Sequence, residues 1–85
     1  MEGFLGQVVV LDMASTYIII GRVERVDENN LMLHEADVHD LRESGSTRDY
    51  YLSQVQANGV RVNRKQVFVR MAEVVGITRL DDCVE

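Results

Sequence analysis

The sequence predicts a mostly β domain of antiparallel strands, with one insertion that is a helix or a long loop. Dense runs of β-branched and aromatic residues at 7–13 and 16–26 are typical of strands rather than helices. The chain also lacks the regular alternation of strands and helices that builds a parallel sheet. Its 85 residues are too few for two independent cores, so we expect a single domain over residues 1–85.

The first two predicted strands cover residues 7–13 and 16–26, and the polar stretch 12–15 suits a tight hairpin between them. Gly21 lies inside the second strand. A residue without a side chain permits the bulge or sharp bend that a sheet needs to curl into a small barrel. We expect that bend; the alternative is an ordinary glycine beneath a large neighbouring side chain.

Three further strands complete the predicted sheet. The Asp and Asn residues at 27–30 indicate a turn, since their side chains bond to the nearby backbone. Residues 31–38 form the third strand. Apolar residues alternate again over 60–71, which predicts the fourth strand, and residues 74–80 form the last.

An insertion over about residues 40–62 separates the third strand from the fourth. Ser46 or Thr47 would cap a helix that stops near Asn58. A hairpin arm with a strand at 50–56 is the rival interpretation. The helix would place three apolar side chains on one face by their spacing: Tyr51, Leu52 and Val55.

Charge is distributed unevenly along the chain. The net charge of -5 argues against generic binding to a phosphate backbone, which relies on Lys and Arg. Acidic residues concentrate at 24–43 and at the C-terminal end, however, so a polarised surface could bind an anion locally. A mixed, solvated surface is the simpler alternative. Five of the nine basic residues lie in one stretch: Arg48, Arg61, Arg64, Lys65 and Arg70.

Membrane and secreted classes lack support in the sequence. No apolar run approaches the roughly 18 residues of a membrane-spanning helix. Residues 1–6 lack the basic flank and apolar core of a signal peptide. The lone Cys83 excludes an internal disulfide and a multi-cysteine zinc site. We therefore expect a cytoplasmic protein that makes no membrane contact.

No catalytic set can be assembled from the sequence. The serines lack a strained-turn context, and two histidines are the available bases. One dense group of potential metal ligands has no known zinc spacing, and an exposed, polar strand end explains it. We expect no enzyme, no metal and no cofactor. The group consists of His34, Glu35, Asp37, His39 and Asp40.

Two segments together resemble the bipartite signature of the Sm and Sm-like (LSm) family. In that family a glycine in the bent second strand precedes an Asp, a short loop with an Asn, and an apolar third strand. This order is matched here by Gly21, Asp27, Asn29 or Asn30, Leu31 and Leu33. The second motif, an apolar strand that ends at an Arg before another apolar strand, is matched by Val67, Val69, Arg70, Val74 and Ile77.

The resemblance implies a small, strongly bent, five-stranded antiparallel barrel that forms homo-oligomeric rings through its fourth and fifth strands. It also implies a pocket for single-stranded, U-rich RNA, with Asn30 reading uracil and Arg70 stacking on or clamping a base. The residues that it assigns to RNA are Asp27, Asn29, Asn30, Arg70 and Met71. Unguarded apolar edges at 67–69 and 74–77 agree with pairing between copies.

Other interpretations of function stay open. The loop after Asp27 is shorter than in the family, and Met71 replaces the usual Gly, so the chain would suit an oligomeric scaffold or protein-interaction module that does not bind RNA. Alternatively, Arg61, Arg64 and Lys65 form a secondary basic surface for phosphates. Tyr50 and Tyr51 would stack bases beside it or pack into the core. Arg70 itself would otherwise be structural and bridge Asp27 or Glu73.

Overall fold

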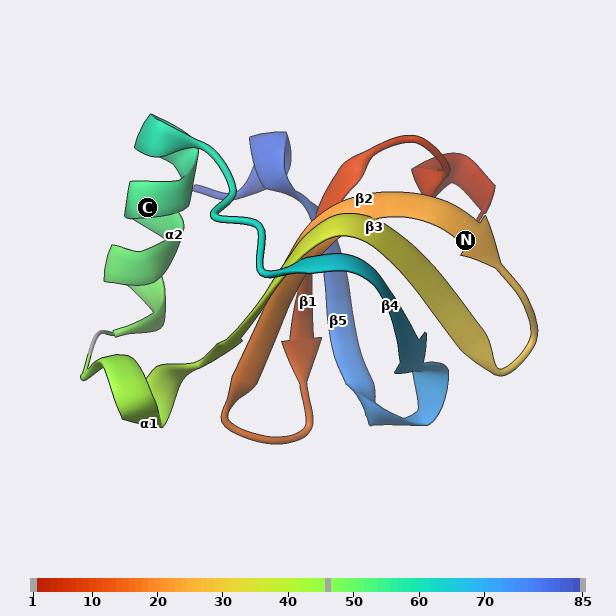
Figure 1. Cartoon of the computed structure of the whole chain (residues 1–85), viewed down its shortest axis with the longest axis horizontal. Coiled ribbons are helices and arrows are strands. Elements are labelled where there is room, and N and C mark those ends of the chain that lie inside the picture. Colours follow the sequence, from red (N-terminus) through yellow and green to blue (C-terminus); the bar gives the residue numbers. More distant parts are fainter. Residues whose placement is uncertain (1, 46, 85) are drawn as a thin grey trace.

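The computed structural model describes residues 2–45 and 47–84 and shows one antiparallel sheet of five strands in the order β4-β3-β2-β1-β5 (Figure 1). The predicted mostly β architecture is confirmed. The strands are β1 (Val8–Met13), β2 (Tyr17–Val26), β3 (Asn30–Asp40), β4 (Arg64–Arg70) and β5 (Val74–Arg79). The helices are α1 (Leu41–Ser44) and α2 (Arg48–Asn58), with single 3-10 turns η1 (Glu2–Phe4), η2 (Met71–Glu73) and η3 (Leu80–Asp82).

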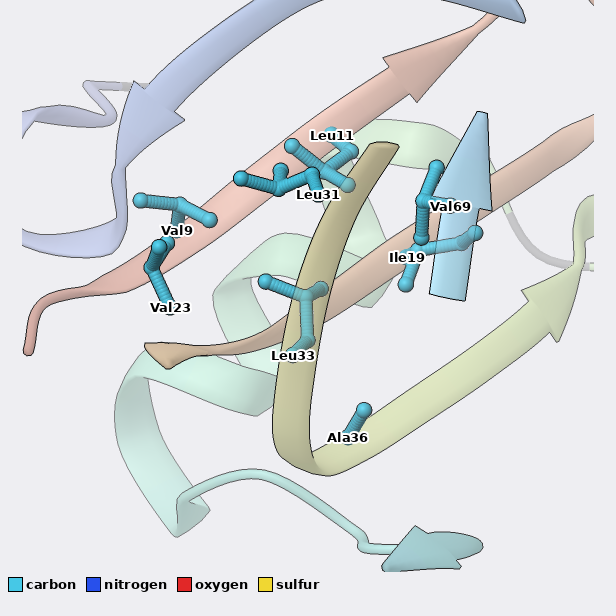
Figure 2. Packing of buried hydrophobic residues seen from close by; sticks show 8 residues of the cluster. All are labelled: Val9, Leu11, Ile19, Val23, Leu31, Leu33, Ala36 and Val69. Carbon is cyan, nitrogen blue, oxygen red and sulfur yellow. The ribbon is translucent and has the colours of Figure 1, made fainter. Parts of the chain in front are cut away.

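The sheet bends where β2 and β3 change register. Ile20 lies opposite Asp37, but Arg22 lies opposite His34, so β3 has one extra residue at this point. Within this bulge, Glu35 has a left-handed backbone with φ of 49°. Figure 2 shows β3 turning sharply at Ala36. The predicted bend at Gly21 is therefore confirmed, and the residues closest to this glycine are Ala36 and Leu33 of β3.

Both faces of β1 are buried, which explains its unbroken apolar run. Alternate residues of a strand point to opposite faces. Val9 and Leu11 accordingly enter one cluster while Val10 enters the other. The first cluster fills the inside of the bend (Figure 2): Val9, Leu11, Ile19, Val23, Leu31, Leu33, Ala36 and Val69. The second lies beneath α2 and comprises Val10, Ile18, Ile20, Tyr51, Leu52 and Val55.

The insertion between β3 and β4 is a helix, not a hairpin arm. The Thr47 side chain accepts a hydrogen bond of 3.1 Å from the backbone N–H of Tyr50 and caps the start of α2. Gly59, with φ of 86°, closes the helix by donating its N–H to the Val55 carbonyl at 2.8 Å. Ser46, the other predicted cap, lies outside the described residues. Among residues 2–45 and 47–84, no helix has the length and apolar character needed to cross a membrane.

The fourth strand is shorter than predicted, and the sheet is not closed. Strand pairing begins at Arg64 rather than at residue 60, because the Asn63 side chain takes the place of ladder bonds beside β3. Its Oδ1 accepts from Val38 N–H at 3.0 Å, and its Nδ2 donates to the Val38 carbonyl at 3.1 Å. Within the described part of the chain, β4 and β5 form the two edges and do not pair with each other.

Candidate nucleic-acid interface

The turn between β2 and β3 is organised by Asp27. Its Oδ1 accepts hydrogen bonds from the backbone N–H of Asn29 at 2.9 Å and of Asn30 at 2.8 Å. Its own N–H donates to the Asn30 carbonyl at 2.9 Å. These two backbone N–H groups lower the pKa of the Asp27 carboxyl, with a smaller contribution from the charge of Arg25. One oxygen of the carboxylate is thus committed to shaping the loop.

Strand pairing brings the two halves of the family signature together. Asn30, the first residue of β3, lies directly opposite Arg70, the last residue of β4. Immediately afterwards, the Met71 N–H donates to the Asn29 carbonyl at 2.9 Å, so the two turns are joined. The resulting depression is lined by Glu28, Asn29, Asn30, Arg70, Met71 and Ala72. We refer to it as the loop pocket.

The side chains of the loop pocket differ in exposure. Arg70 is exposed and Asn30 is half-buried, so both can reach a ligand from the rim. Among residues 2–45 and 47–84, no salt bridge connects Arg70 to Asp27 or Glu73, as a purely structural role would require. Met71 is half-buried and packs against the cluster inside the bend. The pocket therefore offers a ligand the guanidinium of Arg70 and the amides of Asn29 and Asn30, with the carboxylate of Glu28 beside them.

The secondary basic surface lies apart from the loop pocket. Arg64 and Lys65 begin β4, whereas Arg70 ends it. Along an extended strand of this length, the basic surface and the loop pocket are separated by about 20 Å. Arg61 lies in the segment before β4, and all three basic side chains are exposed. A ligand bound in the loop pocket would have to extend along β4 to reach them.

The end of β3 differs from the expectation of an exposed polar strand end. Asp37 and Asp40 are both buried. Asp37 accepts hydrogen bonds from the Tyr51 hydroxyl and from Asn63 Nδ2, and Asp40 pairs with Arg42 at 3.0 Å. The expectation was wrong for these two carboxylates, because Tyr51 of α2 packs against Asp37 and Asp40 caps α1, whereas Glu35 is exposed.

One signal in the sequence pointed to this burial. A tyrosine on the inner face of a helix needs a partner for its hydroxyl, and Asp37 is that partner for Tyr51. Over the described ranges 2–45 and 47–84, no three His, Cys, Asp or Glu side chains are grouped so as to hold a metal ion.

Comparison with known proteins gives a match in structure but none in sequence. No protein-family model matches the chain, and no curated protein matches it. Among solved structures, it is similar to the Sm protein of Pyrococcus abyssii in complex with a uridine heptamer, with a TM-score of 0.63. The two chains are 16% identical over 92% of this chain and 89% of the other. The chain has an Sm-like fold.

The Sm-like fold accounts for the site geometry described above. Its bend at Gly21 and its β3–β4 pairing are what bring the loop after β2 beside the end of β4. This Sm-like chain carries a helix, α2, between β3 and β4. In Figure 1, α2 lies at one end of the molecule, and the β2–β3 turn lies at the opposite end.

Proposed function

We propose that this protein binds single-stranded, uridine-rich RNA without catalysis, as a homo-oligomeric ring. The observation that carries the proposal is the pairing of Asn30 with Arg70 beside a turn held by Asp27. The likeness to an Sm protein in complex with a uridine heptamer supports it. At 16% identity that likeness concerns the fold, so the ligand is inferred from the residues of the loop pocket.

The chemistry of the loop pocket suits a base from a single strand. The amide of Asn30 offers a donor and an acceptor that can pair with the edge of a uracil. The planar guanidinium of Arg70 can stack on the face of the same base. Both side chains come from strand ends held by backbone hydrogen bonds, which reduces the entropy lost on binding.

The sheet edges support assembly into a ring. Phe68 on β4 is 60% exposed and Val75 on β5 is 74% exposed, although both are apolar. An unpaired edge with apolar side chains favours pairing with another chain. Pairing of β4 in one copy with β5 in the next would bury both residues and close the open sheet through neighbours. Each copy would then contribute one loop pocket.

A second candidate function is an oligomeric scaffold that has lost RNA binding. The net charge of -5 and the presence of Glu28 in the loop pocket favour it, since both repel a phosphate backbone. Met71 favours the scaffold as well. Its side chain packs on the core cluster and so takes up space beside the turn that a bound base would need.

A binding assay separates the two candidates. Fluorescence anisotropy with labelled oligo-U and oligo-A would be measured at two salt concentrations, on protein whose mass in solution has been determined. We expect the oligo-U complex to be tighter than the oligo-A complex. Absence of binding to every RNA at low salt, by protein that is oligomeric, would instead support the scaffold.

A further inference from the structure

A second cavity, of about 630 Å³, lies between α2, the end of β3 and the segment 59–63 that leads into β4. Figure 1 shows these three elements at the end of the molecule away from the β2–β3 turn. We call it the helix-side cavity. Its volume is within the range of sites that enclose a small ligand. Among the residues that the structure describes, none lines both this cavity and the loop pocket.

The wall of the cavity that is formed by β3 and α2 is aromatic and fixed in position. The rings of His39 and Tyr51 are stacked, with centroids 4.1 Å apart and planes inclined by 8°. The Tyr51 hydroxyl donates to the buried Asp37 carboxylate, whose other oxygen accepts from Asn63 Nδ2 at 3.0 Å. Because Asp37 is shared by groups from α2 and the 59–63 segment, it holds the walls of the cavity together.

The rim of the cavity carries exposed apolar side chains, whose burial against a ligand would be favourable. Tyr50 is 58% exposed and Val62 is 47% exposed, and both line the cavity from different segments. Tyr50 lies next to Tyr51 on α2 but on the solvent side, so its ring is available to a ligand. Such a ring is a platform on which any planar base can stack.

Polar groups of two kinds complete the lining. Asn58 Nδ2 donates to Gln54 Oε1 at 3.2 Å, which leaves the Gln54 NH₂ group and the Asn58 carbonyl oxygen as a donor and an acceptor. Arg61 is exposed, lines the cavity, and lies near enough to Tyr51 for its charge to oppose the rise in the pKa of that hydroxyl. Within residues 2–45 and 47–84, Arg61 forms no salt bridge.

We propose that the helix-side cavity binds a nucleotide unit, a base together with its phosphate. The base would stack on Tyr50, its edge would pair with the amides of Gln54 and Asn58, and its phosphate would meet Arg61. The unit is either a free mononucleotide or one residue of an RNA strand. The proposal goes beyond the RNA binding assigned to the loop pocket, because it rests on other residues at another place in the fold.

The test is an NMR titration of the full chain with AMP and with UMP, each beside its nucleoside. We expect amide shifts over residues 37–39 and 50–63, and weaker binding of the nucleosides, which lack the phosphate. Tyr50→Ala and Arg61→Ala should each weaken binding by roughly five- to 100-fold. Tyr50→Phe keeps the ring and should keep the affinity. Arg25→Ala, which removes an exposed positive charge elsewhere, is the matched control.

Titration with oligo-U and oligo-A then identifies the source of the nucleotide. Tighter binding of an oligonucleotide than of UMP or AMP at the same amides supports an RNA strand, and equal binding supports a free mononucleotide. The proposal is overturned if millimolar AMP and UMP shift none of these amides, or if inorganic phosphate alone shifts them as strongly. An oligo-U that shifts only residues 28–30 and 70–72 would overturn it while leaving RNA binding by the loop pocket intact.

Discussion

A Cβ atom placed on Gly21 would lie 2.9 Å from the Cβ of Ala36 and 3.2 Å from the Cβ of Leu33. Real Cβ atoms essentially never approach as closely as the first of these distances. The two neighbours belong to β3 at its sharp turn, where both are buried in the cluster inside the bend. The bend that joins the two halves of the sheet therefore depends on the absence of a side chain at Gly21.

The first prediction concerns this contact. Gly21→Val should lower the free energy of unfolding by on the order of 1–3 kcal/mol, because β3 must move outward to admit the side chain. Urea denaturation measures the change. Gly76→Ala is the control, since a Cβ there would meet its nearest atom, Asp12 Oδ2, at an ordinary 3.8 Å. Equal midpoints for wild type and Gly21→Val would show that the bend does not need glycine.

The second prediction concerns Glu35, whose φ of 49° is unfavourable for a residue with a side chain. Glu35→Gly should raise the free energy of unfolding by up to about 1 kcal/mol, since relief of strain exceeds the gain in unfolded-state entropy. Glu24→Gly, at an exposed position of β2 without positive φ, should instead lower it by roughly 0.5–1 kcal/mol. Thermal melts of both variants check the opposite signs.

The third prediction concerns assembly. Phe68→Lys and Val75→Lys place a charge on the exposed face of each edge strand, and each should dissociate the ring into folded monomers. Sedimentation velocity measures the mass, and circular dichroism checks that the strands remain. Val84→Lys, at a 93% exposed position outside both edge strands, should leave the mass unchanged. A wild-type protein that is monomeric at micromolar concentration would refute the ring.

The fourth prediction concerns the loop pocket. Asn30→Ala and Arg70→Ala should each weaken oligo-U binding by roughly 1–3 kcal/mol per bound base without changing the mass of the assembly. Arg64→Ala and Lys65→Ala should lower affinity evenly across sequences and flatten its salt dependence, because they would act on phosphates. If Arg70→Ala and Lys65→Ala had the same effect on every RNA, the loop pocket would not be reading bases.

The fifth prediction concerns acid stability. The hydrogen bond from the Arg42 side chain, together with bonds from the Arg42 N–H and the Thr16 hydroxyl, lowers the pKa of Asp40 from 3.8 to about 2. A lowered folded-state pKa stabilises the fold above the unfolded value, and this contribution is lost as the pH falls from 3.8 to about 2. Asp40→Asn should make the free energy of unfolding less dependent on pH over this range. Urea denaturation at several pH values measures the change.

A substitution of Arg42 tests whether its side chain causes the lowered pKa of Asp40. Arg42→Gln should also make the free energy of unfolding less dependent on pH over this acid range. It removes the charged donor that contributes most to the lowered pKa of Asp40. If the free energy of unfolding of Arg42→Gln falls as steeply with acid as that of wild type, the pH dependence comes from other carboxylates.

The sequence by itself determined the five strands apart from the start of β4, together with the turn at 27–30 and the bend. β-branched runs, Asp and Asn at a turn, and a glycine inside a strand act through their own backbone and nearest neighbours, so they can be read without knowing the fold. The helix over residues 48–58 was also predictable, because its cap and its stop are local. The family resemblance added that Asn30 and Arg70 belong to one pocket.

Only the tertiary structure decided which side chains are covered. Asp37 looked like part of an exposed strand end, but α2 lies over it and Tyr51 binds it. The adjacent tyrosines of α2 have opposite fates, since the helix buries one and leaves the other at the rim of the helix-side cavity. Burial depends on which distant segments pack together, and that is a property of the assembled fold rather than of any local stretch.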